Sequence, residues 1–184
     1  IQIEHTGTVA GNLCNASPAA DGVPPLLALD ASVEITSTAG TRVLPLGEFL
    51  HGPRRTALAA GELVSAIHVP AEAPGARSRF RKLGARRYLV ISIAMVAAVL
   101  DIRDRRVFGA RIAVGACSGV AQRLPGLENV LAGAPANAHL GDFAQPEHLE
   151  PLNPIDDLRA SAAYRREAAL TLVRRALNEL GADA

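Results

Sequence analysis

The sequence predicts an α+β fold made of two units, residues 1–70 and residues 78–184. Short alternating segments bounded by Gly and Pro fill the first unit. The second combines a long apolar hairpin pattern at residues 91–117 with a helical stripe near the C-terminus. Between them, residues 71–77 (AEAPGAR) are rich in Ala, Pro and Gly, which is typical of a linker.

The first unit is expected to open with loop-rich residues 5–25. A short helix follows in PPLLALDA, because two prolines suit a first helical turn and three leucines supply an apolar face. Alternation of apolar and polar residues predicts the strands that come next. The expected elements are a hairpin of residues 32–36 and 41–46, one helical turn at 46–50, and a strand at 62–69 that Pro70 ends.

The second unit is expected to begin with an extended segment at residues 78–83 and a hairpin of residues 91–103 and 107–117. Its first arm is rich in alanine, but recurring β-branched residues favour a strand. A short helix at 124–131 and a long loop lead to a last helix at 158–180. An apolar stripe predicts that helix, while Arg165 and Arg166 fall off the stripe and are expected on a solvated or subunit-contacting face. An anion-binding patch beside Tyr164 is the alternative for these two arginines.

The composition excludes several classes of protein. There are 19 basic and 18 acidic residues among 184, and aromatics make up 3%, so neither a basic patch nor a stacking surface for nucleic acid is expected. The longest apolar run, residues 89–100, is too short to span a membrane. Residues 1–5 lack the features of a signal peptide and an initiator Met, so we expect a piece of a longer, cytoplasmic protein.

Metal binding and nucleophilic catalysis have no sequence support. Cys14 and Cys117 lie far apart, the five His are scattered, and neither Ser17 nor Ser118 has His and Asp in register. We therefore expect no metal site, no catalytic residue, and two reduced, buried thiols.

The segment Thr8-Val9-Ala10-Gly11-Asn12 is the strongest candidate for a binding site. Its small residues let backbone N–H groups approach an anion, and a helix starting just after them would add its dipole. Taken alone, the segment could equally be a structural turn. Lys82 is the single lysine beside 18 arginines, and a solvated surface cation is the alternative there.

A longer string, TVAGNLCNASPAAD, resembles the second flavin-binding segment of the FAD subunits of molybdenum hydroxylases, the xanthine dehydrogenase and carbon monoxide dehydrogenase group, whose pattern is T-I-G-G-N-x-x-x-A-S-P-x-x-D. Downstream, PPLLALDA, GELVSAIHVP, FRKLGAR and IDDLRASAAYRR resemble further segments of the same family. The resemblance implies the second subdomain of a two-subdomain, PCMH-type FAD-binding domain, followed by a C-terminal domain with an antiparallel sheet and helices.

The resemblance also implies site residues. Thr8, Val9, Ala10, Gly11 and Asn12 would contact the FAD pyrophosphate and ribityl region. Asp21 would bond the cofactor, Val64 would pack near the flavin, and Lys82 would stabilise its reduced form. The residues alone also allow Asp21 to be a helix N-cap and Val64 an ordinary core residue.

The implied function is to pass electrons from iron–sulfur clusters through FAD to an external acceptor, in a hetero-oligomer with a molybdopterin-binding large subunit and an iron–sulfur small subunit. The family's first FAD-binding subdomain is missing here, so the fragment is expected to be inactive and to retain little FAD. NAD is not implied as the acceptor. Two alternatives stay open: a flavin-free docking module of the same complex, and a flavin domain linked covalently through Cys14 or His5.

Overall fold

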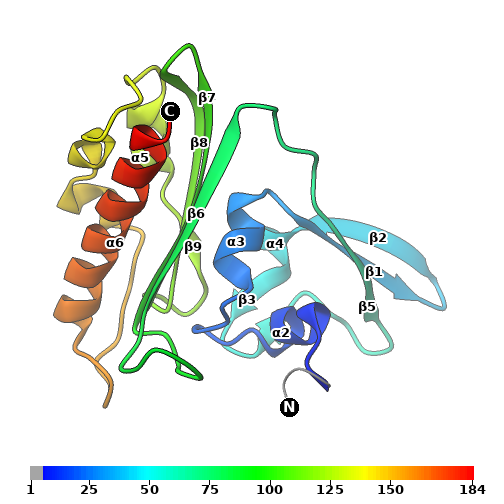
Figure 1. Ribbon diagram of the computed structural model, residues 1–184. Helices are drawn as coiled ribbons and strands as arrows, with labels where there is room; N and C mark the ends of the chain where they lie inside the picture. The colour runs from blue at the N-terminus through cyan, green and yellow to red at the C-terminus, as the bar shows by residue number, and fades with distance from the viewer. Residues whose placement is uncertain (1–5) are drawn as a thin grey trace.

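The computed structural model describes residues 6–184, so the interpretation of residues 1–5, His5 included, lies outside the described residues. The chain forms three layers (Figure 1). An antiparallel sheet stands in the middle, the C-terminal helices cover one face, and the first unit covers the other. The predicted α+β class is confirmed.

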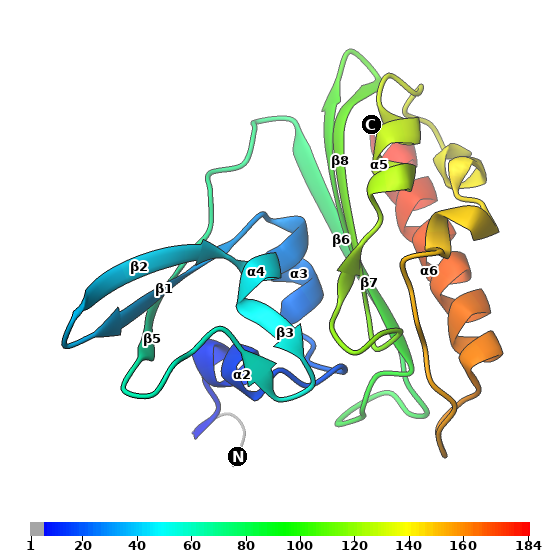
Figure 2. The ribbon, with the colours of Figure 1, turned by 180° about the vertical axis from the view of Figure 1, so that it is seen from behind.

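The first unit is a small sheet with short helices beside it. Its sheet has the order β2-β1-β5 with antiparallel neighbours, and the β1–β2 hairpin projects away from the rest of the molecule (Figure 2). Val33 and Ile35 alternate along β1 into the core, as the sequence predicts. Its elements are α2 (Val9–Asn15), α3 (Val23–Ala28), β1 (Ser32–Ser37), β2 (Gly40–Pro45), α4 (Leu46–Phe49), β3 (Leu50–Gly52), β4 (Arg55–Thr56) and β5 (Leu63–His68).

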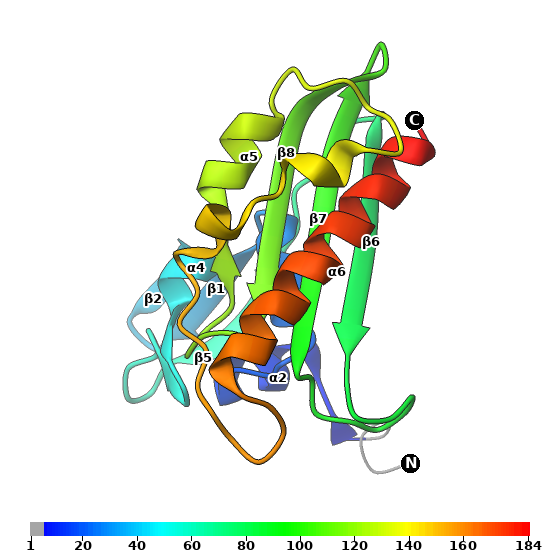
Figure 3. The same ribbon diagram turned by 90° about the vertical axis from the view of Figure 1, so that its left-hand side faces the viewer.

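The second unit contains the large sheet, with the order β6-β7-β8-β9. Helix α6 runs obliquely across one face of this sheet, with α5 beside it (Figure 3). Its elements are β6 (Ala76–Leu83), β7 (Ala94–Arg103), β8 (Arg106–Gly115), β9 (Gln122–Arg123), α5 (Pro125–Leu131), the 3₁₀ helices η1 (Leu140–Phe143) and η2 (Pro146–Leu149), and α6 (Ala162–Ala182).

Strand β7 is buried on both faces. Val96, Ala98 and Leu100 pack toward the C-terminal helices, whereas Ala97 and Val99 pack against the first unit. This double burial explains why the strand reads as an unbroken apolar run. It also means that the two units share a core, in which α3 lies against β7 and β8.

Several boundaries correct the sequence prediction. Residues 9–15 were expected in a loop-rich segment but form α2, and β6 begins at Ala76, inside the predicted linker. Helix α6 begins at Ala162 rather than at 158, because the Ser161 hydroxyl caps it by accepting a hydrogen bond from the Tyr164 amide. The long loop before α6 contains η1 and η2.

Candidate functional site

The TVAGN segment forms the cap and first turn of helix α2. Thr8 is the N-cap: its Oγ1 accepts a hydrogen bond from the Gly11 amide at 2.9 Å, and its carbonyl accepts one from the Asn12 amide at 3.0 Å. Because Thr8 caps the helix, Val9 to Gly11 are already helical, which corrects the prediction of a helix that starts only after Asn12. N–H groups at the start of a helix point outward, where the helix dipole favours negative charge.

A cavity of about 560 Å³ opens beside this end of α2. Cavities of roughly 300–1,000 Å³ are typical of sites for small molecules. Of the five predicted residues, only Ala10 does not line it. The lining residues are Thr6, Gly7, Thr8, Val9, Gly11, Asn12, Asn15 and Gly22. Three of these residues are glycines, and at Gly11 and Gly22 the missing side chain leaves room for the Thr8 hydroxyl and the Asn12 side-chain oxygen.

Asn12 has an unsatisfied oxygen in this wall. Its Oδ1 is buried and has no hydrogen-bond partner within residues 6–184. A Cβ atom at Gly22 would lie 2.9 Å from that oxygen, so glycine allows the close approach. Buried oxygens are almost always hydrogen-bonded, and an orphaned one needs an explanation such as a missing ligand or water.

Asp21 and Lys82 form an ion pair that joins the first unit to β6. The Lys82 Nζ lies 2.5 Å from Asp21 Oδ2, and the Ser92 hydroxyl donates to Asp21 Oδ1 at 2.7 Å. Lys82 is only 25% exposed, so the solvated-cation alternative is wrong. The N-cap of α3 is Gly22, and no side chain caps that helix, so the N-cap alternative for Asp21 is wrong as well.

Asp21 is next in the chain to Gly22, which lines the α2 cavity. The ion pair and the first turn of α2 are therefore neighbours, although neither Asp21 nor Lys82 lines the cavity itself. Val64 does not line it either. It is half-buried on β5 against the core of the first unit, and β5 contacts α2.

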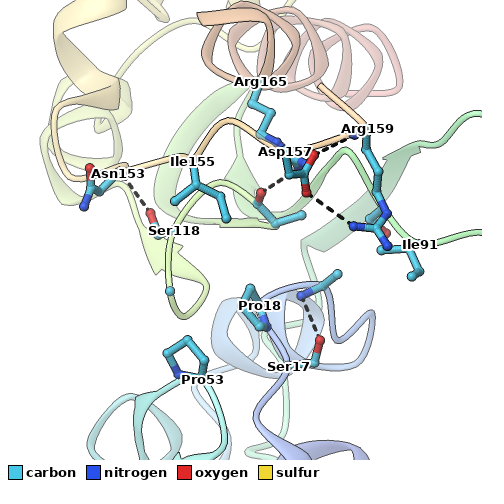
Figure 4. Close-up of a pocket in the computed structure, with 14 residues that line it drawn as sticks. Ser17, Pro18, Pro53, Ile91, Ser118, Asn153, Ile155, Asp157, Arg159 and Arg165 are labelled. Atoms are coloured by element: carbon cyan, nitrogen blue, oxygen red, sulfur yellow. Dashed lines mark hydrogen bonds and ion pairs between the residues drawn. The ribbon is translucent and has the colours of Figure 1, made fainter. Parts of the chain in front are cut away.

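A second cavity, of about 380 Å³, lies between the two units (Figure 4). It is enclosed by the chain after α2, the end of β8 and the segment before α6, with Ser17, Ser118 and Asp157 among its lining residues. Arg165 reaches into its wall from α6 and is 4% exposed. The expectation of a solvated face for Arg165 is therefore wrong. Arg166 is also partly buried, since it donates to the Leu149 and Leu152 carbonyls.

Asp157 is the acidic partner in this wall. Hydrogen bonds from the Arg159 amide and the Arg165 guanidinium lower its pKa to about 2. Its carboxylate is thus charged at neutral pH. No motif or spacing predicts Ser92 or Arg165 as part of this site, although Ser92 is the one polar residue in the apolar run.

The thiols offer little support for a covalent flavin link. Burial raises the pKa of Cys14, which lines neither cavity, and raises that of Cys117 to about 11. Protonated thiols are poor nucleophiles. Within residues 6–184, no cluster of His, Cys, Asp and Glu could hold a metal ion, and no helix there is long and apolar enough to cross a membrane.

Two family matches cover most of the chain. Residues 1–72 match the FAD binding domain in molybdopterin dehydrogenase, and residues 79–180 match the CO dehydrogenase flavoprotein C-terminal domain. The chain belongs to the family of FAD-binding medium subunits of molybdenum hydroxylases of the xanthine and CO dehydrogenase type.

Curated relatives and solved structures agree with this assignment. The chain is 35% identical over 182 residues to the nicotine 6-hydroxylase medium subunit of Paenarthrobacter nicotinovorans, covering 98% of this chain and 63% of that protein. It is 28% identical to the xanthine dehydrogenase FAD-binding subunit of Escherichia coli O157:H7, covering 100% and 63%. Reconstituted CO dehydrogenase from Oligotropha carboxidovorans matches with a TM-score of 0.91 at 28% identity, covering 100% and 64%. The chain thus spans less than two thirds of these relatives.

Proposed function

We propose that this chain is part of the flavoprotein subunit of a molybdopterin-dependent dehydrogenase and binds FAD together with the family's first FAD-binding subdomain. Residues 1–70 would form the second FAD-binding subdomain, residues 71–77 a linker, and residues 78–184 the C-terminal domain. Family membership supports this proposal, as do relatives named as medium or FAD-binding subunits.

The observation that carries the proposal is the adjacency of two features. The first turn of α2 opens on a cavity with an unsatisfied Asn12 oxygen, and the Asp21–Lys82 ion pair stands one residue from that cavity's wall. The cavity at the first turn of α2 suits the pyrophosphate and ribityl part of FAD. The ion pair supplies a cation, Lys82, for the flavin ring, which becomes negative on reduction.

Each predicted residue then has a physical role. The outward N–H groups of Val9 and Ala10 would face the pyrophosphate, and Thr8 would keep that turn in place through its cap on the Gly11 amide. Asn12 Oδ1 would accept a hydrogen bond from a ribityl hydroxyl. Val64 would exclude water beside the ring from its place on β5.

Lys82 and Asp21 would act as a unit. Bound FAD supplies the redox chemistry, taking up electrons and passing them on. The Lys82 ammonium would stabilise negative charge that develops near it, while Asp21, held by Ser92 through Oδ1, would orient that ammonium through Oδ2. In this proposal no residue of the chain would form or break a bond with a substrate, and the chain's part would be binding and electrostatic tuning.

The complete protein would work in an assembly. We propose that a molybdopterin-binding large subunit and an iron–sulfur small subunit are its partners in a cytoplasmic hetero-oligomer, and that electrons pass from the iron–sulfur clusters through FAD to an external acceptor. The relative titled CO dehydrogenase and the relatives named as medium chains support this arrangement. The two free cysteines, Cys14 and Cys117, suit a reducing compartment.

The test is an FAD titration of the full-length subunit, followed by flavin absorbance and fluorescence. We expect stoichiometric binding, and about three- to tenfold weaker binding for Asn12→Ala, the loss that one hydrogen bond accounts for. Asn129→Ala, an exposed change on α5, is the matched control and should bind as the wild type does.

Two results would contradict the proposal. A full-length subunit that stays colourless with excess FAD would favour the flavin-free docking module. Stoichiometric FAD on residues 1–184 alone would show that the first subdomain is not needed, against the expectation of an inactive fragment.

A further inference from the structure

Arg165 is the one charged residue among the fully buried residues of the described chain. Burying a guanidinium is costly unless hydrogen bonds and an opposite charge replace the lost water. Arg165 lies in the second turn of α6, at a position where the sequence pattern allows a solvent-facing side chain. Its burial is therefore explained by the segments of the chain that its guanidinium binds.

Its guanidinium joins three segments that are far apart in the sequence. Nη1 donates to the Ile93 carbonyl at 2.6 Å and to the Ala116 carbonyl at 3.1 Å, and Nη2 donates to Asp157 Oδ1 at 2.8 Å. Ile93 leads into β7, Ala116 follows β8, and Asp157 precedes α6. Figure 4 shows Arg165 and Asp157 meeting at the wall of the cavity between the units.

Ile93 and Ala116, whose carbonyls accept from Arg165, also form backbone hydrogen bonds to residues close in the chain to Lys82 and Asp21. The Ile93 amide donates to the Leu83 carbonyl at 2.8 Å, next in the chain to Lys82. The Ala116 amide donates to the Pro18 carbonyl at 2.9 Å, three residues before Asp21.

A third connection runs through the side chain of Ser92. This residue precedes Ile93, is 1% exposed, and donates its hydroxyl hydrogen bond to Asp21. The Arg165 guanidinium thus holds two residues, Ile93 and Ala116. Three connections lead from them to the ion pair: the Ile93 bond to Leu83, the Ala116 bond to Pro18, and the bond from Ser92, the neighbour of Ile93, to Asp21.

We propose that Arg165 is a positioning residue for the Lys82 ammonium, acting through Ile93, Ser92 and Asp21. This inference rests on the proposed function, because the ammonium matters for a flavin bound beside it. Without the guanidinium, the start of β7 and the chain after β8 lose their common anchor. Ser92 then holds Asp21 less firmly, and Lys82 leaves its place.

The first test needs no FAD. In the FAD-free full-length subunit, trace acetylation of Lys82 is measured by peptide mass spectrometry. Arg165→Gln should raise the Lys82 rate about threefold, as expected for release of a partly exposed ion pair. Arg166→Gln is the matched control: it also removes two bonds to backbone carbonyls of one segment, 149–152, but leaves the route to Lys82 intact, so the rate should not change.

The second test is the midpoint potential of bound FAD. Arg165→Gln should weaken the binding of reduced FAD about tenfold more than that of oxidised FAD, which lowers the potential by about 30 mV for a two-electron couple. Ser92→Ala should shift it in the same direction. Because both residues act on one route, the double variant should shift the potential by less than the sum of the two single changes.

Equal Lys82 rates and equal potentials in Arg165→Gln and Arg166→Gln would overturn the inference and leave Arg165 a purely structural residue. If Arg165→Gln does not fold, Arg165→Lys decides by the same criteria, since one ammonium cannot reproduce the planar fork. A subunit that binds no FAD would contradict the proposed function, whereas the acetylation rates would still decide this inference.

Discussion

Gly22→Ala tests whether the Asn12 wall of the α2 cavity has a function. The added Cβ would lie 2.9 Å from Asn12 Oδ1, where an ordinary van der Waals contact is at least 3.4 Å. The side-chain amide of Asn12 must therefore move by about 0.5 Å. Gly22 has φ −76°, which any residue adopts, so the backbone is not strained. A displacement of about 0.5 Å is at the limit that a preorganised site tolerates. We expect little change in stability and a loss of FAD affinity of about three- to tenfold.

The assay combines FAD titration of the full-length subunit with chemical denaturation. Gly126→Ala is the control, because its Cβ would meet only the His148 ring, at 3.7 Å, far along the chain on α5. The reasoning is refuted if Gly22→Ala binds FAD as tightly as the control does. It is also refuted if the affinity falls only in proportion to a loss of folded protein.

Three further changes test the physical account of the fold. Thr8→Ala removes the cap of α2 and should cost about 1 kcal/mol in the free energy of unfolding, while Thr8→Ser should restore most of it. Asp157→Asn should lower the melting temperature at pH 7; because the folded pKa of Asp157 is lowered from 3.8 to about 2, the difference from wild type should shrink as the pH falls from 4 to 2. Gly181→Ala should cost about 2 kcal/mol by denaturation, since its Cβ would lie 2.0 Å from the Asn137 carbonyl oxygen, and a wild-type midpoint would contradict that contact.

Strands β1 and β8 could be predicted from local patterns because each presents a period of two to a core. Val33 and Ile35 alternate in β1, and the residues of β8 alternate against the C-terminal helices. Strand β7 was ambiguous for a physical reason: both its faces are buried, so alternation disappears and alanines fit against α3. Packing of both faces of β7 against other elements determines that this segment is a strand, and no local sequence pattern contains that information.

The helix boundaries and the buried arginine were harder to predict. A threonine before small residues can start either a turn or a helix, and in α2 the Thr8 hydroxyl makes the first turn helical. Arg165 falls on a polar stripe, but the carbonyls that hold it come from residues 93 and 116, which are brought to α6 by the sheet. Long-range partners of this kind leave no spacing signal in the sequence.

The candidate site residues were found through a run of small residues, a single lysine and the family motif rather than through periodicity. The motif added Asp21 and gave Lys82 a role; the two are 61 residues apart, and the structure joins them in one ion pair. Their role toward FAD stays a proposal. Ser92, whose hydroxyl donates a hydrogen bond to Asp21, is marked in the sequence only as the one polar residue in an apolar run.

The midpoint potential of FAD in Lys82→Met, compared with Arg81→Met, tests the central claim most directly. Both changes remove one positive charge from adjacent positions of β6, but Arg81 pairs with Glu179 on α6, on the opposite face of the sheet. We predict a potential about 30 mV lower for Lys82→Met, equivalent to about 1.4 kcal/mol, and no shift for Arg81→Met. Equal potentials in the two variants would contradict the placement of the Lys82 charge beside the flavin.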